Sequence, residues 1–320
     1  MRQIAHTNLI QAVAAYEKDQ EGGDRCFVFP WASGGNLRQM WMRDSPPLDP
    51  KDVFPWAWQQ IRGLTEGLFK LHEKGTRHGD LKPENILIFT RVNEPKPGSL
   101  VIADVGIAKY HAYETSVRKA RNLPPTTTRT FTRLYEPPEI RLADDLSVIS
   151  RRYDSWSLGC VLLEFVIWLQ CGRSGLKDFH EERGRGIIND DRFWSPEGGK
   201  DGSLHPAASG WIHKLLKRFD KQPKLRPWRK LLNLVKSHLL VVGLDRHQSE
   251  HRKSIKEFWE ELQRIHEKCS ADLSGPYIWE RSDMVLTKSR KSAAQVIDDF
   301  DMSISQQVSS AEIFRSNFAG

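Results

Sequence analysis

The stretch that decides the fold runs from Arg77 to Phe89 and reads RHGDLKPENILIF. Pro83 prevents a helix here, because its ring fixes its own φ angle and disfavours the helical conformation at the preceding residue. The polar residues are therefore expected on a loop, and the last four residues, ILIF, on a short buried strand. On such a loop Asp80 can accept a proton from a hydroxyl, Lys82 can hold a phosphate oxygen, and Asn85 can bind a hard cation through its carbonyl.

A second acidic residue follows one short strand later. Residues 100–103, LVIA, predict another buried strand, which ends at Asp104-Val105-Gly106. A carboxylate at the end of a strand can bind Mg²⁺ that bridges the phosphates of a nucleotide. Asp and Gly are common at strand ends, so this pattern alone is weak evidence for a metal site. It becomes informative because it lies one short hairpin after the Asp80 loop.

Composition describes a globular chain of 320 residues, long enough for one large domain or two ordinary ones, with a formal net charge of +7. We read the basic residues as scattered, so the charge favours an anionic ligand such as a nucleotide, and no nucleic-acid partner is expected. The cysteines at positions 26, 160, 171 and 269 lack metal-binding spacing and predict reduced thiols in an intracellular protein, cytoplasmic or nuclear. The most apolar run, residues 158–169, contains Glu164 and is too short to span a bilayer, so no membrane insertion is expected.

Several motifs together resemble those of protein kinases. The first loop resembles the kinase catalytic loop H-R-D-L-x-x-x-N, with Gly79 in place of the arginine. The second, Asp104-Val105-Gly106, is similar to the kinase D-F-G element, with Val105 in place of the phenylalanine. Residues 132–139, TRLYEPPE, resemble T-x-x-Y-x-A-P-E, and residues 153–164, YDSWSLGCVLLE, resemble the D-x-W-S-x-G helix of the kinase C-lobe.

The resemblance implies an α+β, protein kinase-like fold with a mostly helical C-lobe and an incomplete N-lobe β-sheet. It implies ATP and Mg²⁺ as cofactors and a serine/threonine kinase that transfers phosphoryl groups to protein hydroxyls. Asp80 would be the catalytic base and Lys82 would steady the γ-phosphate, while Asn85 is implied both in catalysis and, with Asp104, in holding the metal. The residues implied in nucleotide binding are Phe29, Trp31, Ala32, Leu87 and Asp104.

Supporting contacts are implied as well. Asp154 would tie down the backbone near His78, and Arg226 would pair with Glu139. Residues 104–139 would form an activation segment, in which Thr132 would bond the catalytic aspartate and lysine. Gly79 removes the arginine that docks a phosphorylated activation segment. Candidate phosphorylation sites on that segment are Thr126, Thr127, Thr128 and Thr130.

Apolar periodicity and turn residues predict the remaining elements. Strands are expected at residues 9–16 and 26–29, and Asn36 or Ser33 is expected to cap a helix that runs through Trp41. Helices are predicted at residues 53–74, 153–164, 211–219, 231–240 and 249–268, and residues 172–210 read as loop with short helices. We divide the chain into a remnant of the N-lobe with the hinge (1–32), a C-lobe (33–242), a C-terminal helical extension (243–283) and a polar, flexible tail (284–320).

The N-terminal part departs from the family pattern. Residues 6–10, HTNLI, are similar to the motif that leads into the fourth N-lobe strand, so the Gly-rich loop, the strand lysine and the helix glutamate of kinases find no counterpart in this sequence. We therefore expect little or no kinase activity from this chain as given. Two other readings stay open: a pseudokinase or interaction scaffold without catalysis, which nucleotide binding without turnover would reveal, and a small-molecule phosphotransferase, which a substrate screen would reveal.

Overall fold

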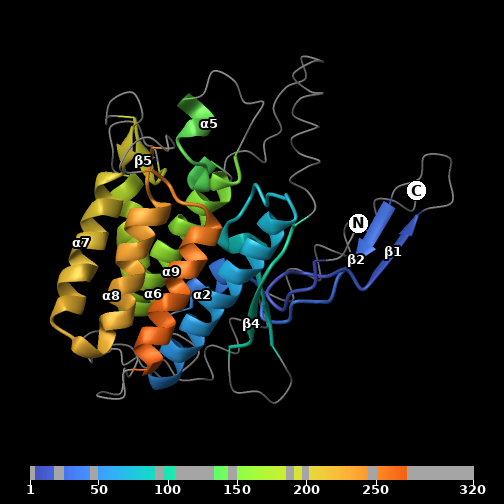
Figure 1. Ribbon diagram of the computed structural model, residues 1–320, viewed down its shortest axis with the longest axis horizontal. Helices are drawn as coiled ribbons and strands as arrows, with labels where there is room; N and C mark the ends of the chain where they lie inside the picture. Colours follow the sequence, from blue (N-terminus) through green and yellow to red (C-terminus); the bar gives the residue numbers. More distant parts are fainter. Residues whose placement is uncertain are drawn as a thin grey trace, which may run out of the picture. The chain divides into compact units, whose positions relative to one another are not determined.

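The fold is organised around helix α6 (Arg152–Gly184), which is buried on every side from Tyr153 to Gln170. Figure 1 shows the computed structural model of the chain, which describes residues 4–17, 25–43, 50–90, 97–105, 133–142, 150–184, 191–196, 202–243 and 251–271. These residues all belong to one compact unit. Most of the expected activation segment, with its threonines, and the whole of the expected tail lie outside the described residues.

The burial of α6 follows from its sequence, because apolar side chains occur on all sides of the helix and leave no polar face to contact water. Among the described helices, α6 alone is long and apolar enough to cross a membrane by length and composition, and 94% of its most apolar window is buried inside the protein. Burial of that extent is typical of a core helix. The expectation of a helix at residues 153–164 is confirmed.

Four further helices pack around this core. Helix α2 (Pro50–Glu73) lies against α9 (Ile255–Ala271), and α7 (Pro206–Asp220) lies against both α6 and α8 (Arg226–Leu234), as Figure 1 shows. A single π-helical turn, η4 (Val235–Leu239), continues α8 and packs on α6. The predicted apolar stripe of α2 is buried and comprises Phe54, Trp58, Ile61, Leu64, Leu68 and Leu71. The helices expected at residues 53–74, 211–219, 231–240 and 249–268 are thus all present, with shifted bounds.

The strands are short and pair as antiparallel hairpins. They are β1 (Ala14–Glu17) with β2 (Arg25–Val28), β3 (Ile86–Phe89) with β4 (Ser99–Ile102), and β5 (Trp194–Ser195) with β6 (Ser203–Leu204). The chain before β1 also joins the second hairpin, because the Ile10 N–H donates to the Ile102 carbonyl at 2.8 Å. Only the end of the strand expected at residues 9–16 forms as such.

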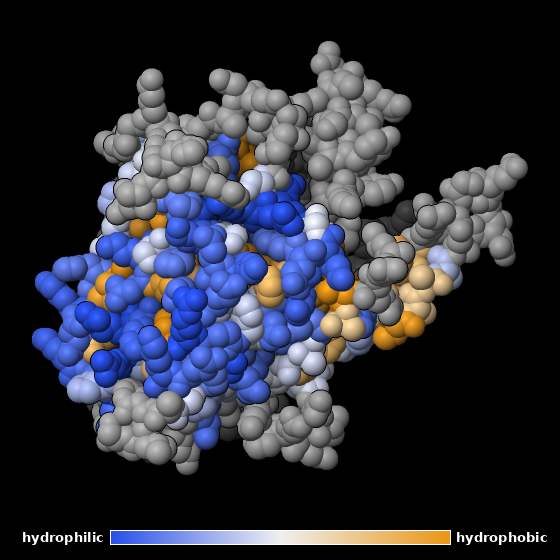
Figure 2. All heavy atoms as spheres, viewed as in Figure 1, coloured by the Kyte–Doolittle hydropathy of each residue, from blue (hydrophilic) through white to orange (hydrophobic). Residues whose placement is uncertain are grey.

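The β1–β2 hairpin carries large apolar side chains that remain exposed to water. Phe27 is 57% exposed and Tyr16 is 56% exposed, and Figure 2 shows apolar colour over this hairpin. A two-stranded hairpin is marginal in isolation, because each strand has a partner on one side only. The core therefore lies in the helices, not in this sheet.

Short elements connect the helices to the site. Helix α1 (Leu37–Trp41) begins at Asn36, whose side chain accepts the Gln39 N–H while the Gln39 side chain accepts the Asn36 N–H, so Asn36 is the cap. The 3-10 turns η1 (Pro83–Asn85) and η2 (Arg133–Tyr135) and the single turn α5 (Glu139–Leu142) carry three of the motif segments. A third 3-10 turn, η3 (Pro223–Leu225), joins α7 to α8.

One prediction about the helical part is confirmed only in part. Residues 172–210 were expected to be loop with short helices, and a helical segment that ends at Gly184 does follow Gly172, which breaks the regular helix with φ of 67°; this segment directly continues α6 without a loop between them. The helix continues because Leu176 and Phe179 are buried beyond the break and are spaced for one helical face.

Candidate active site

The backbone of the Asp80 loop is held by a buried carboxylate on α6. Asp154 accepts the N–H of His78 through Oδ2 and the N–H of Gly79 through Oδ1, each at 2.8 Å, and its Oδ2 lies 2.7 Å from His72 Nε2. Burial alone would raise the pKa of Asp154, but the hydrogen bond and charge of His72 and the further contacts lower it below the ordinary value. The expectation that Asp154 ties down the backbone near His78 is confirmed.

Gly79 stands at a backbone position that disfavours a side chain. Its φ angle is 81°, in the left-handed region that glycine enters at no steric cost. Both carboxylate oxygens of Asp154 are bound to this turn, so the conformation is fixed from the core side. Gly79 therefore suits the shape of the loop as well as removing the arginine of the family motif.

Asp80, Lys82 and Asn85 form one hydrogen-bonded group on this loop. Lys82 Nζ lies 2.7 Å from Asp80 Oδ2, and Asn85 Nδ2 donates to the Asp80 carbonyl at 2.8 Å and to Asp80 Oδ2 at 3.1 Å. The Asp80 side chain is 32% exposed and the Lys82 side chain is 17% exposed. The loop thus presents a half-buried carboxylate with a cation beside it, as a base facing a phosphoryl donor requires.

The orientation of Asn85 follows from its partners. Both partner atoms are oxygens that can only accept, so the nitrogen of the amide must face them. Its Oδ1 is then the atom left to bind a cation.

His78 joins this loop to the end of β4. Its Nδ1 accepts the Asp80 N–H at 3.2 Å, so its Nε2 carries the proton and donates to the Ala103 carbonyl at 2.7 Å. The Ala103 N–H in turn donates to the Asn85 carbonyl at 2.8 Å. These bonds bring residue 104 to the same end of the β3–β4 hairpin as Asn85.

Asp104 is exposed and has a φ angle of 63°. Among the described residues it is the single non-glycine residue with a positive φ, a conformation that aspartate tolerates at a modest cost. The described residues contain no group of three or more His, Cys, Asp or Glu side chains that could hold a metal ion alone. Of the residues expected to hold Mg²⁺, the Asn85 amide oxygen and the Asp104 carboxylate are the oxygen ligands that would be offered to such a cation at this end of the hairpin.

Of the residues expected to contact adenine, Leu87 lies in β3, and Phe29, Trp31 and Ala32 lie on the segment that leads from β2 to α1. The segment after Trp31 runs beside this strand, since the Gly34 N–H donates to the Ile88 carbonyl at 2.9 Å and Asn36 bridges to Leu87. Leu87 is half-buried between two fully buried isoleucines, so it faces away from the core. Ala32 forms a turn in which its carbonyl accepts the Gly35 N–H at 3.2 Å. Phe29 and Trp31 are 50% and 88% exposed.

Sequence reasoning missed Arg38, which ties the loop to α1 and α6. Its Nε donates to Glu84 Oε1 at 2.9 Å, its Nη2 donates to the Tyr135 hydroxyl, and its Nη1 lies 3.9 Å from Glu164 Oε1. Its guanidinium also lies 5.6 Å from the ring centre of Trp41. Arg38 lies on the short helix α1, and the residues around it in the sequence give no signal for this role.

Glu164 is the buried centre of that network. The Tyr135 hydroxyl donates to its Oε2 at 2.6 Å, and His180 Nε2 lies 2.7 Å from its Oε1. Burial alone would raise the pKa of Glu164, but the His180 hydrogen bond and the charges of Arg38, His180 and Arg183 lower it to about 2. The segment before the P-P-E element is thereby fixed to α6.

The expected pair of Glu139 with Arg226 is wrong. Glu139 pairs with Arg252, whose Nη1 and Nη2 donate to the two carboxylate oxygens at 2.7 and 3.1 Å. The Arg252 side chain is fully buried, whereas Arg226 is exposed on α8. The Arg252 Nε also donates to the Val241 carbonyl at 2.9 Å. The sequence gives little signal for this choice, because Arg226 begins α8 and Arg252 lies three residues before the start of α9.

Comparison with known proteins agrees with these motifs. The family model of the protein kinase domain matches residues 1–217. The chain is 29% identical over 252 residues to serine/threonine-protein kinase PKH3 of Eremothecium gossypii, covering 78% of this chain and 30% of that protein. It is 32% identical over 164 residues to serine/threonine-protein kinase MAK of Mus musculus, covering 51% and 22% respectively.

A third relative is cyclin-dependent kinase F-4 of Oryza sativa subsp. japonica, which is 26% identical over 166 residues, covering 52% of this chain and 30% of that protein. The chain thus spans 22% to 30% of the length of these three relatives.

Proposed function

Because the chain belongs to the protein kinase family, we propose that it transfers the γ-phosphoryl group of ATP to a serine or threonine hydroxyl of a protein. The observation that carries the proposal is the Asp80 group, in which one carboxylate oxygen is bound by Lys82 and Asn85. The presence of Lys82 two residues after Asp80 favours serine or threonine over tyrosine by resemblance to the family.

Asp80 accepts the proton of the substrate hydroxyl in this proposal. Its Oδ2 is engaged by Lys82 and Asn85, so within the described part of the chain Oδ1 is the oxygen left for the hydroxyl. The hydroxyl oxygen forms a bond to the γ-phosphorus as the bond to the leaving ADP oxygen breaks. Asp80 takes up the released proton, and the fixed backbone of the loop keeps its carboxylate in place during the transfer.

Lys82 steadies the negative charge that moves during this transfer. An ammonium group has three donors, and one of them binds Asp80. The others can bind oxygens of the transferring group, which is stabilised by charge in a partly dehydrated site. When bound, Mg²⁺-ATP supplies the phosphoryl group and screens its charge; Asn85 and Asp104 would hold the cation, and Leu87 and Ala32 would lie against the base.

The test measures transfer of the labelled γ-phosphate from Mg²⁺-ATP to a library of serine- and threonine-containing peptides by the full chain, for which we expect a low but Asp80-dependent turnover. Asp80→Asn keeps the size of the side chain but removes the base, so turnover should fall by about 10²–10⁴-fold. Nucleotide affinity should stay within about twofold, because Asp80 binds the hydroxyl side of the reaction. Lys74→Gln, an exposed lysine outside the loop, is the matched control and should leave turnover unchanged. Phosphorylation that persists in Asp80→Asn would overturn the assignment.

A non-catalytic scaffold is the second candidate, favoured by the exposure of Trp31 (88%) and Phe29 (50%) at positions assigned to the nucleotide. Side chains that are this exposed to water would bury little of the surface of a bound adenine base. Calorimetric titration of the chain with Mg²⁺-ATP, combined with the peptide assay, separates the two candidates. Peptide phosphorylation that depends on Asp80 identifies a kinase, and nucleotide binding or partner binding without it identifies a scaffold.

A further inference from the structure

The basic residues are not evenly spread along the chain, contrary to our expectation. Residues 214–236 contain nine Lys or Arg side chains and one acidic side chain, so this short segment carries more positive charge than the net +7 of the whole chain. The segment covers the end of α7, the turn η3, α8 and the start of η4. We call these residues the α7–α8 basic surface: Lys214, Lys217, Arg218, Lys221, Lys224, Arg226, Arg229, Lys230 and Lys236.

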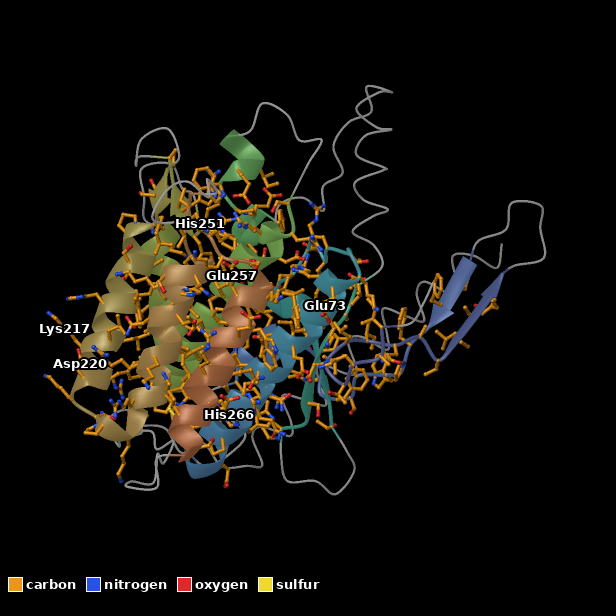
Figure 3. The ribbon with its side chains drawn as sticks, in the orientation of Figure 1. Glu73, Lys217, Asp220, His251, Glu257 and His266 are labelled. Atoms are coloured by element: carbon orange, nitrogen blue, oxygen red, sulfur yellow. The ribbon has the colours of Figure 1, made fainter. Side chains whose placement is uncertain are left out.

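The fold exposes seven of these nine residues and leaves Arg218 and Lys230 half-buried. The apolar residues of α7, among them Trp211, Leu215 and Phe219, are buried against the core, which leaves the other face of the helix to the lysines. Lys214, Lys217 and Lys221 are exposed and are spaced by three and four residues, so they follow one face over about 10 Å. Figure 3 labels Lys217 and Asp220 at the outer side of α7.

The turn between the helices is held in one shape by the single acidic residue. Asp220 forms an ion pair with Arg229, which joins the end of α7 to the first turns of α8. Within that turn Lys221 and Arg226 are exposed. The charge is therefore presented by packed helices and a tied turn, not by a loose segment.

The chemistry of this surface excludes two classes of anionic partner in favour of a third. The large exposed hydrophobic side chains of the described residues all lie between Val13 and Met42, so none anchors this surface in a lipid interface. None is available here to stack on the bases of a single strand either. Both helices lie flat against their neighbours α6 and α9, so neither stands out to enter a duplex groove.

We propose that the α7–α8 basic surface binds an acidic, extended segment of a partner protein, rich in Asp, Glu or phosphorylated side chains. Lysines dominate the surface, and their mobile point charges suit a flexible partner whose carboxylates need no fixed geometry. An extended strand advances about 3.3 Å per residue, so about three residues follow α7 and further ones reach around the turn. Helix α7 packs on α6, α8 packs on α9, and the two helices pack on each other, so a bound segment would lie on the faces that these contacts leave open.

The test measures fluorescence anisotropy of a labelled glutamate-rich peptide of about 12 residues with the full chain, at low and at physiological salt. The variant Lys217→Gln/Lys221→Gln/Arg226→Gln removes three exposed charges from the surface. The control Lys74→Gln/Lys177→Gln/Lys256→Gln removes three exposed charges elsewhere, so both variants have the same net charge. Thermal unfolding of each variant checks that the fold is kept.

We expect binding that weakens with salt and falls by about 10-fold or more in the surface variant, since each exposed ion pair changes an equilibrium constant by about two- to fivefold. The control should lose less than about twofold. Equal losses in the two variants would show attraction by net charge alone and overturn the proposal, as would no binding at low salt. Tighter, surface-dependent binding to anionic lipid vesicles or duplex DNA than to the peptide would also overturn it.

Discussion

Replacing Arg252 with alanine should destabilise the fold strongly, whereas the same change at Arg226 should not. Arg252 is fully buried and binds both oxygens of Glu139, the Val241 carbonyl and, at 3.2 Å, the Arg152 carbonyl. Its guanidinium also lies 4.9 Å from the ring centre of Trp156. One side chain thus joins the start of α5, the start of α6 and the segment that leads into α9.

The magnitude follows from what the substitution leaves behind. Breaking a buried ion pair by removing one partner costs about 3–5 kcal/mol, because the other charge stays in a poor environment. The Glu139 side chain is 19% exposed, so water can relieve part of that cost, but the carbonyls that Arg252 satisfies lose their donors as well. We therefore expect a loss near the lower end of the range, about 3 kcal/mol.

The assay is urea or thermal unfolding of the full chain, followed by tryptophan fluorescence. A loss of about 3 kcal/mol corresponds to a fall in Tm of about 6–12 °C for a domain of this size. Arg226→Ala is the matched control: its side chain is exposed on α8, and the free energy of unfolding should stay within about 0.5 kcal/mol. Similar shifts in the two variants, or a larger shift for Arg226→Ala, would refute the pairing read from the structure.

Three further predictions concern the site and its supports. Gly79→Ala should lower the free energy of unfolding by about 1–2 kcal/mol in urea titrations, because φ at this residue is 81°. The pKa of Glu164 falls from an ordinary 4.5 to about 2, so this group contributes about 3 kcal/mol that is complete above about pH 4.5 and is lost as the pH falls towards 2. Acid unfolding of Glu164→Gln should lack that step, and an unchanged acid profile would contradict the assignment. Asp104→Asn should weaken Mg²⁺-dependent nucleotide binding by about 10-fold or more while leaving Tm unchanged, which calorimetric titration measures.

The parts of the site that lie close together in the chain could be predicted from the sequence. Pro83 excludes a helix, and the alternation of polar and apolar residues places a loop directly before a strand, so the grouping of Asp80, Lys82 and Asn85 follows from local geometry. The contact of Asp154 with this loop was also predicted, although it spans more than seventy residues. It rested on the family motif, not on spacing.

The identity of the partner of Glu139 could not be predicted, because it depends on which arginine the fold buries. Arg226 begins α8 and Arg252 lies shortly before α9, and no local pattern marks either arginine for burial. The difference arises because α9 packs on α2 and α8, and because the Arg252 N–H donates to the Gly243 carbonyl at 2.9 Å, which holds Arg252 in the core. Burial of a single charged side chain is a property of tertiary packing.

Buried charged and polar side chains of α6 hold the segments that form the site. Asp154 holds the Asp80 loop, the Ser157 hydroxyl donates to the Tyr135 carbonyl at 3.0 Å, and Glu164 binds the Tyr135 hydroxyl. Apolar residues of similar volume would avoid the cost of removing these groups from water, and such exchanges in other proteins are often neutral or stabilising.

Stability alone therefore does not explain why a core helix carries these groups. Each of these groups binds a segment that lacks a core of its own, such as the Asp80 loop or η2. An apolar replacement would release that segment while α6 stayed packed. The position of Asp80 is thus set less by its own loop than by hydrogen bonds that start on α6. Loss of site geometry and loss of fold should accordingly separate when Glu164, Arg38 and Arg183 are replaced together by apolar residues, because a change that kept Arg183 would leave its buried charge without the Glu164 carboxylate.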